Sequence, residues 1–316
     1  MSYRTKISLL AVIAVLLMIT FLFLDLPGNW QYALPRRTKK VLAIALTGAA
    51  IAFATVLFQT ITNNRILTPS IIGLDSLYML VQTFVVFVFG SVHIVMLNKQ
   101  LNFIISVGFM VLFAGVLYRI IFRREGRNIY FLLLIGLVCG TLFSSLSTFM
   151  EVLIDPNEFA VIQDKSFASF NNVNTELLVI SFAGVSAVAL YYLRYAKYMD
   201  VLSLGKEHAV NLGVPYDTVV KKLLIAVSIL ISISTALVGP ITFLGLLVAN
   251  VTYEFMKTYR HRYLITASIL ISMIALVGSQ LLAERVFELT TTISVIINFI
   301  GGVYFLYLLL RENRSW

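Results

Sequence analysis

The sequence predicts an all-α membrane protein with about ten transmembrane helices, and three observations lead to this prediction. Of its 316 residues, 59% are hydrophobic and only 12% are charged, with a mean hydropathy of +0.93. Soluble domains carry about 25% charged residues, so this chain has too few to cover a surface that faces water. Its apolar residues also form long continuous runs rather than the alternating pattern of a membrane β-barrel.

Ten segments reach or approach the roughly 20 apolar residues that a helix needs to cross a bilayer. They are 7–24, 41–61, 71–90, 101–122, 129–150, 175–195, 218–238, 241–256, 263–282 and 291–310. The first segment has basic residues before it but no small-residue cleavage site after it, so we expect an uncleaved helix. With no flexible linker visible, residues 1–316 are predicted to form one polytopic domain.

The positive charges predict the orientation of these helices. Lys and Arg gather in alternate connections, as in the group Arg194, Lys197, Lys206, Lys221 and Lys222. The positive-inside rule assigns such connections to the cytoplasm, which places both termini there as well. The net charge of +9 is therefore interpreted as loop charge at a membrane, and no nucleic-acid partner is expected. One cluster breaks the rule at the outer side, namely Arg36, Arg37, Lys39 and Lys40.

Several kinds of chemistry are missing from the sequence. It has no GxxxxGK[ST] phosphate loop, no HExxH motif and no GxSxG motif. Its three histidines, His93, His208 and His261, fall in separate predicted connections, and Cys139 is its only cysteine. We therefore expect no enzymatic activity, no metal and no cofactor bound by this chain.

The polar residues inside the predicted helices are mostly uncharged. Carboxylates near the middle of a span are scarce, which disfavours a secondary transporter driven by an ion gradient. The amides Gln59, Asn250 and Asn298 have two interpretations of equal weight: hydrogen bonding between helices, or lining of a translocation pathway.

Residues 202–214 form the most distinctive connection. Gly205 and Gly213 bracket seven residues that could make one or two helical turns, and Pro215 follows as a helix breaker. A short amphipathic helix at the inner surface suits docking to a soluble partner, although an ordinary interfacial helix has the same pattern. A second break, Gly239–Leu246, predicts a tight reversal between two spans at the outer face.

These motifs, in this order, resemble the FecCD/vitamin B12-type permease family of ABC importers over roughly residues 30–311. The matching residues are Leu34-Pro35-Arg36 with Gly48-Ala49-Ala50, then Gln59, Pro69 and Gly73, then the 202–214 segment, then Gly239, Ile241, Phe243, Gly245 and Leu246, and finally Gly301-Gly302. The chain departs from the family pattern at Ala249-Asn250, where Pro-His is usual.

The resemblance implies a type II ABC importer permease bundle in a bacterial cytoplasmic membrane. It implies that a separate cytoplasmic ATPase, which uses the ATP, grips Leu204, Gly205, Ala209, Leu212, Gly213 and Val214. It implies that Arg36 and Arg285 dock an extracytoplasmic binding protein, and that a second permease chain, a paralogue, completes the pathway. The implied cargo is an iron–siderophore complex of the catecholate or petrobactin-like kind, with haem or cobalamin as the alternative.

Overall fold

The computed structural model describes residues 2–25, 30–121, 129–171, 173–288 and 291–312, and within these ranges it contains helices and no strand. The elements in chain order are α1 (Tyr3–Phe23), α2 (Trp30–Thr62), the 3-10 helix η1 (Pro69–Ile72), α3 (Leu74–Phe89), α4 (Ile94–Leu97), α5 (Lys99–Ile121), α6 (Ile129–Leu153), α7 (Pro156–Ser166), α8 (Thr175–Leu193), α9 (Ala196–Leu202), α10 (Lys206–Asn211), α11 (Tyr216–Val238), α12 (Leu244–Met256), α13 (His261–Arg285) and α14 (Ile293–Glu312).

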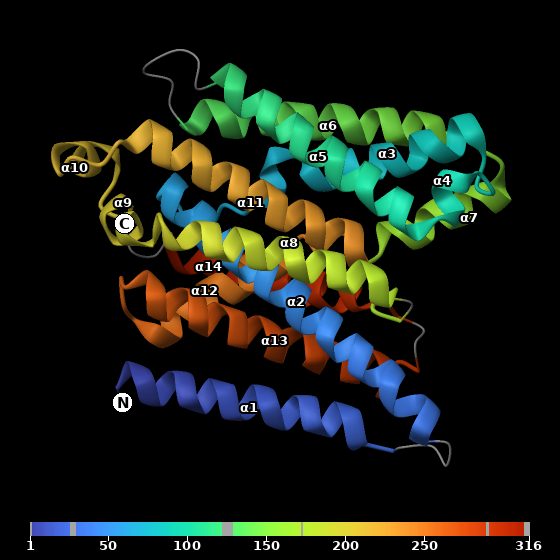
Figure 1. Cartoon of the computed structure of the whole chain (residues 1–316), viewed down its shortest axis with the longest axis horizontal. Helices are drawn as coiled ribbons and strands as arrows, with labels where there is room; N and C mark the ends of the chain where they lie inside the picture. Colours follow the sequence, from blue (N-terminus) through green and yellow to red (C-terminus); the bar gives the residue numbers. More distant parts are fainter. Residues whose placement is uncertain (1, 26–29, 122–128, 172, 289–290, 313–316) are drawn as a thin grey trace.

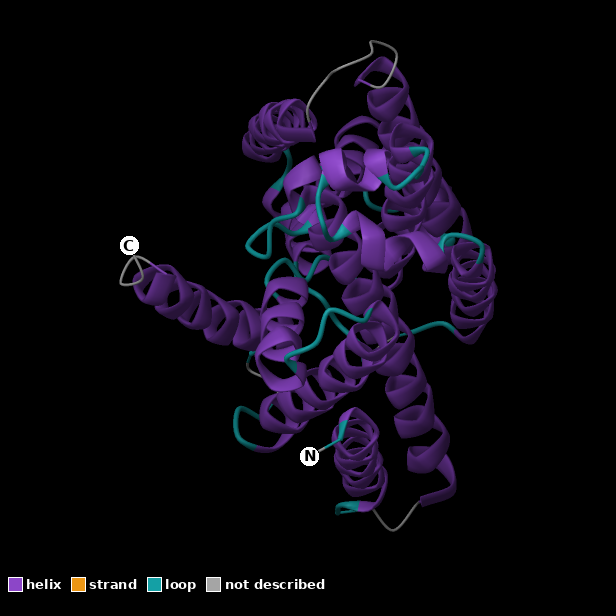
Figure 2. Ribbon diagram, turned by 90° about the vertical axis from the view of Figure 1, so that its left-hand side faces the viewer, coloured by secondary structure: helices purple, strands orange, loops and turns teal. Residues whose placement is uncertain are grey.

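The long helices run side by side along the longest axis of the molecule (Figure 1). Both termini lie with α9 and α10 at one end of the bundle, and α4 and α7 lie at the opposite end. We call these the α10 end and the α7 end. α14 extends away from the bundle toward the C-terminus (Figure 2).

Ten apolar helices correspond one to one with the ten predicted segments. Seven of the described helices are long and apolar enough to cross a membrane, namely α1, α2, α5, α6, α8, α11 and α13, and three shorter apolar helices are α3, α12 and α14. The predicted all-α class is confirmed. The hydrophobic core is centred on α2, whose residues from Ala50 to Thr62 are all buried.

The structure corrects two boundaries at the α7 end. α2 begins at Trp30, well before the predicted start at residue 41, and keeps Pro35 inside the helix. Pro35 is the sixth residue of the helix, so its missing N–H leaves only one carbonyl, in the first turn, without its usual helical partner. The stretch 151–174, which lies between two of the predicted spans, contains α7, where Asp155 caps the helix through the N–H of Asn157 and Pro156 occupies the first turn.

Glycines bring η1 into direct contact with α6. Gly73 has φ +84°, a left-handed conformation that side chains disfavour, and it forms the joint between η1 and α3. A Cβ atom added at Gly136 on α6 would lie 2.8 Å from the Cα of Ile72. In lipid, small residues of this kind allow the close packing that holds helices together.

We expect Gly136→Ala to destabilise the protein by about 1–3 kcal/mol, because the new methyl group meets backbone that cannot rotate away. The matched control is Gly108→Ala on α5, where an added Cβ meets nothing within 4 Å. Unfolding of the purified protein in mixed micelles by a denaturing detergent measures both variants. Equal stability of the two would contradict this packing.

Candidate functional site

A pair of short helices, α9 and α10, forms the connection between α8 and α11 at the α10 end (Figure 1). The turn between the helices falls at Ser203 to Gly205, and Gly205 has φ +93°. Gly213, which follows α10, has φ +80°. The predicted segment 202–214 is thus helical over part of its length, and the helical region begins earlier, at Ala196.

Exposure divides the predicted coupling residues into two groups. Leu204 and Leu212 are 55% and 64% exposed, and so present apolar side chains at the tip of the segment. Ala209 is fully buried and Val214 is 7% exposed, so these two hold the segment against the bundle. Neighbouring exposed apolar residues with charged residues beside them are typical of a surface that binds another protein.

At the α7 end, the four-cation cluster lies on the first turns of α2 instead of in a loop. Arg37 donates to the carbonyl oxygens of Phe21, Leu22 and Leu24, and therefore satisfies the last turn of α1. Lys40 forms an ion pair of 2.8 Å with Glu284 on α13. The contacts of Arg37 and Lys40 are thus within the chain and stabilise its fold.

Arg36 differs from its neighbours because its guanidinium remains at the surface. It stacks on the ring of Tyr32 at 5.3 Å and receives no carboxylate partner from the described part of the chain. Arg285, the other predicted docking cation, lies at the same end but pairs with Asp25 at 3.0 Å and donates to the carbonyl of Leu24. The structure thus leaves Arg36 better placed than Arg285 to receive an external carboxylate.

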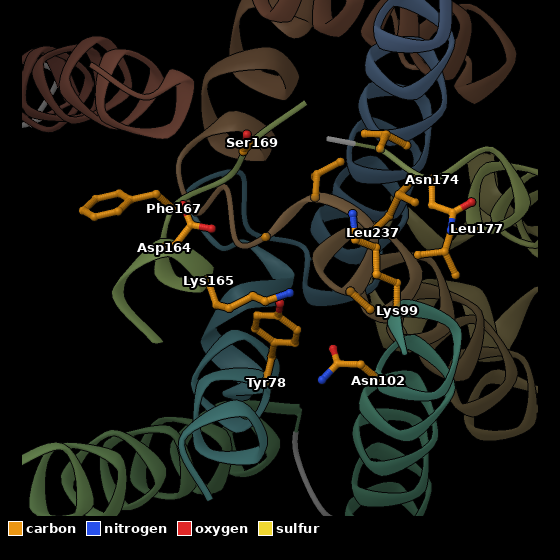
Figure 3. A pocket seen from close by; sticks show the side chains of 14 residues that line it. Tyr78, Lys99, Asn102, Asp164, Lys165, Phe167, Ser169, Asn174, Leu177 and Leu237 are labelled. Carbon is orange, nitrogen blue, oxygen red and sulfur yellow. The ribbon is translucent and has the colours of Figure 1, made fainter. Parts of the chain in front are cut away.

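Two neighbouring cavities open at the α7 end. One, of about 230 Å³, is lined by Tyr78, Lys99, Lys165 and parts of α8 and α11, and the side chains of Lys165 and Lys99 enter it from opposite sides (Figure 3). Burial lowers the pKa of Lys165, an effect that Asp164 partly opposes. The other, of about 280 Å³, is lined by Arg36, Lys39, Lys40 and Lys99 among others.

The three amides predicted for the pathway bind backbone atoms of this chain. Gln59 and Asn250 both donate to the carbonyl oxygen of Arg65, at 2.6 and 3.0 Å. The side-chain oxygen of Asn298 accepts from the N–H of Phe243 at 3.4 Å. These bonds fix the two irregular connections that precede η1 and α12, which matches the hydrogen-bonding interpretation. Lining of a pathway by the three residues stays a prediction.

Sequence reasoning missed a polar group near the α10 end. His261, at the start of α13, contacts both Asp200 on α9 and Thr60 on α2. The sequence places this histidine in a connection between predicted spans and gives no sign of its two partners, because they are distant in sequence. For α7, in contrast, a signal existed: Asp155-Pro156 is a typical helix start.

Comparison with curated proteins gives relatives along the whole chain. The chain is 65% identical to the petrobactin import system permease protein YclO of Bacillus subtilis (strain 168) over 316 residues, which are 100% of both chains. It is 38% identical to the petrobactin import system permease protein FatC of Bacillus anthracis over 278 residues, covering 88% of this chain and 78% of that one. A second protein of that organism, the petrobactin import system permease protein FatD, is 28% identical over 88% of this chain and 81% of its own length.

Two further comparisons address the fold and the family. A solved structure of a metal-chelate type ABC transporter in an inward-facing conformation superposes with a TM-score of 0.86 at 20% identity, covering 98% of this chain and 99% of that chain. This likeness shows a shared fold. The family model described as the FecCD transport family matches residues 4–311. The chain therefore belongs to the FecCD transport family of membrane permeases.

Proposed function

We propose that this chain is a membrane-spanning permease subunit of an ATP-driven importer that carries an iron–siderophore complex of the petrobactin type. The observation that carries the proposal is the 65% identity to a petrobactin import permease over all of both chains. The all-helical bundle and its ten apolar helices fit a multi-pass membrane protein. Haem and cobalamin, the alternative cargoes, have weaker support because the relatives at 65% and 38% identity carry petrobactin in their names.

The proposed partners follow from the two ends of the bundle. An ATPase subunit binds the exposed apolar tip of α9 and α10, which places the α10 end and both termini in the cytoplasm. A substrate-binding protein docks at the α7 end, where Arg36 offers a charge to a carboxylate of that protein. Charge pairs of this kind orient the partner and speed its association.

A second permease chain completes the pathway in this proposal. One organism has two petrobactin permeases, FatC and FatD, that match this chain at 38% and 28% identity, which supports pairing of two different chains. α14 offers a free surface for such a partner or for lipid, with the apolar residues Phe299, Val303 and Leu306 exposed. ATP binding and hydrolysis then tilt the helices of the two chains, so that the pathway opens alternately to each side.

The cargo is tested by deleting the gene and measuring uptake of radiolabelled iron supplied as petrobactin, as a hydroxamate siderophore or as haem. We expect loss of petrobactin-dependent uptake alone, restored by the gene on a plasmid. Unchanged petrobactin uptake together with a loss for another chelate would refute the proposed cargo and leave the importer class intact.

We expect Arg36→Glu to weaken docking of the binding protein by roughly tenfold or more, because a repulsive charge replaces an attractive one. Arg36→Lys keeps the charge at the same place and serves as the control. Binding of the labelled binding protein to the importer in nanodiscs measures the effect, with subunit assembly checked separately. Equal affinity in both variants would remove Arg36 from the docking face.

We expect Leu212→Glu to weaken binding of the ATPase by roughly tenfold or more, since a charge would replace an apolar side chain at the contact. Val92→Glu is the matched control, because Val92 is also exposed, at 77%, but lies in the turn after α3 at the opposite end. Co-purification of the ATPase with each variant is the measurement. An unchanged yield for Leu212→Glu would place the ATPase elsewhere.

A further inference from the structure

A carboxylate on α9 binds the first residue of α13. One oxygen of Asp200 accepts from the backbone N–H of His261 at 2.9 Å and from Nδ1–H of the same residue at 2.7 Å. The imidazole is buried, with 5% of its side chain exposed, whereas Asp200 is 49% exposed. The two residues are distant in sequence and meet where α9 crosses the start of α13.

This contact caps the start of α13, for which the preceding residue provides no capping side chain. The first N–H groups of a helix lack partners within the helix and carry a partial positive charge. The residue before α13, Arg260, provides no side-chain cap. Asp200, on another helix, supplies the missing acceptor and a negative charge. A charge-assisted hydrogen bond of this kind contributes more to stability than an exposed ion pair between mobile side chains does.

The opposite nitrogen of the same imidazole contacts α2. Nε2 of His261 lies 2.8 Å from the hydroxyl oxygen of Thr60. The same hydroxyl lies 2.8 Å from the carbonyl oxygen of Val56 one turn earlier, so it is held between the imidazole and the backbone of α2. A single buried ring thus joins α9, α2 and α13. We refer to Asp200, His261 and Thr60 as the clasp.

The two long helices that the clasp joins, α2 and α13, also contact each other in the middle of the bundle and at its α7 end. Midway, a Cβ added at Gly48 on α2 would lie 2.9 Å from the hydroxyl oxygen of Ser272 on α13, so the helices are closely packed. At the α7 end, Lys40 and Glu284 join them again at 2.8 Å, with both side chains about one-fifth exposed. α2 and α13 are therefore in contact at three levels along the bundle.

We propose that Asp200, His261 and Thr60 are positioning residues that transmit movement of α9 and α10 to the α2–α13 pair, and through this pair to the docking face that carries Arg36. The inference rests on the proposed function. Apolar contacts of Met199 and Leu202 also hold α9 on the bundle, since both side chains are buried. Apolar contacts permit sliding, whereas hydrogen bonds require a set distance and direction, so the clasp determines how α9 moves relative to α13.

The test uses the complete importer in nanodiscs and three variants of similar size to the native residues. Asp200→Asn removes the charge. His261→Asn places an amide near the position of Nδ1 and loses the contact with Thr60. His261→Gln reaches toward Thr60 and loses the side-chain contact with Asp200, while the backbone N–H of residue 261 still donates to Asp200. Stimulation of ATP hydrolysis by the loaded binding protein, relative to basal hydrolysis, is the readout, because a purely structural contact would leave this ratio unchanged in assembled complexes.

We expect the stimulation ratio to fall about fivefold or more in each variant, with basal hydrolysis and subunit assembly retained. Asp217→Asn is the control, because it also removes an aspartate charge at the α10 end but breaks only an exposed 3.7 Å contact with Lys206. Its ratio should equal that of the native protein.

A ratio within about twofold of the native value in all three assembled clasp variants would overturn the inference. Loss of assembly in all three would also overturn it, because the contacts would then serve folding rather than transmission. Failure of the native complex to couple hydrolysis to chelate uptake would instead refute the proposed function.

Discussion

The architecture depends on how α2 is enclosed by protein. A helix in lipid gains little from burying apolar side chains against other apolar side chains, so association depends on close packing and on polar contacts. α2 has both. Ala50, Ala52 and Ala54 let neighbouring helices approach its middle, and Lys40 and Thr60 make polar contacts toward its two ends. Arg36 lies on the first turns of α2 and Thr60 lies on its last turn. This one helix therefore connects the two surfaces at which partners are proposed to bind.

Polar side chains of this bundle support the places where the chain changes direction. The amides of Gln59 and Asn250 share the carbonyl of Arg65, and Asn298 supports the turn before α12. Unpaired backbone groups at membrane depth are costly, so irregular connections need side-chain partners of this kind. The predicted spans contain few charged residues, and this scarcity agrees with the proposal that a partner supplies the energy for transport.

The sequence predicted those features that depend on local composition. All ten apolar segments became helices, because hydropathy over about 20 residues is a strong local signal. The motif residues from Leu204 to Val214 lie in α10 and in the turns on either side of it, although Ala196 and not Leu202 begins the helical region. Asp155-Pro156 begins α7 between two predicted spans, and these residues alone do not identify the helix, since a turn and a helix start favour the same residues.

Other features depend on contacts that no local pattern encodes. His261 finds Asp200 and Thr60 only after α9, α2 and α13 have packed. Arg285 is predicted to face a partner, yet it pairs with Asp25, because Asp25, just after the end of α1, lies beside the end of α13. Sequence reasoning identifies such residues as charged or polar candidates, and only the three-dimensional arrangement shows which partners they have.

The central claim is that this chain moves its cargo only when a partner hydrolyses ATP. The most direct measurement reconstitutes the purified chain in liposomes, first by itself and then with the second permease chain and the ATPase, and follows entry of the ferric chelate delivered by the binding protein. The account predicts uptake only with the full set of subunits and ATP. Uptake driven by an ion gradient in liposomes that contain this chain alone would contradict it.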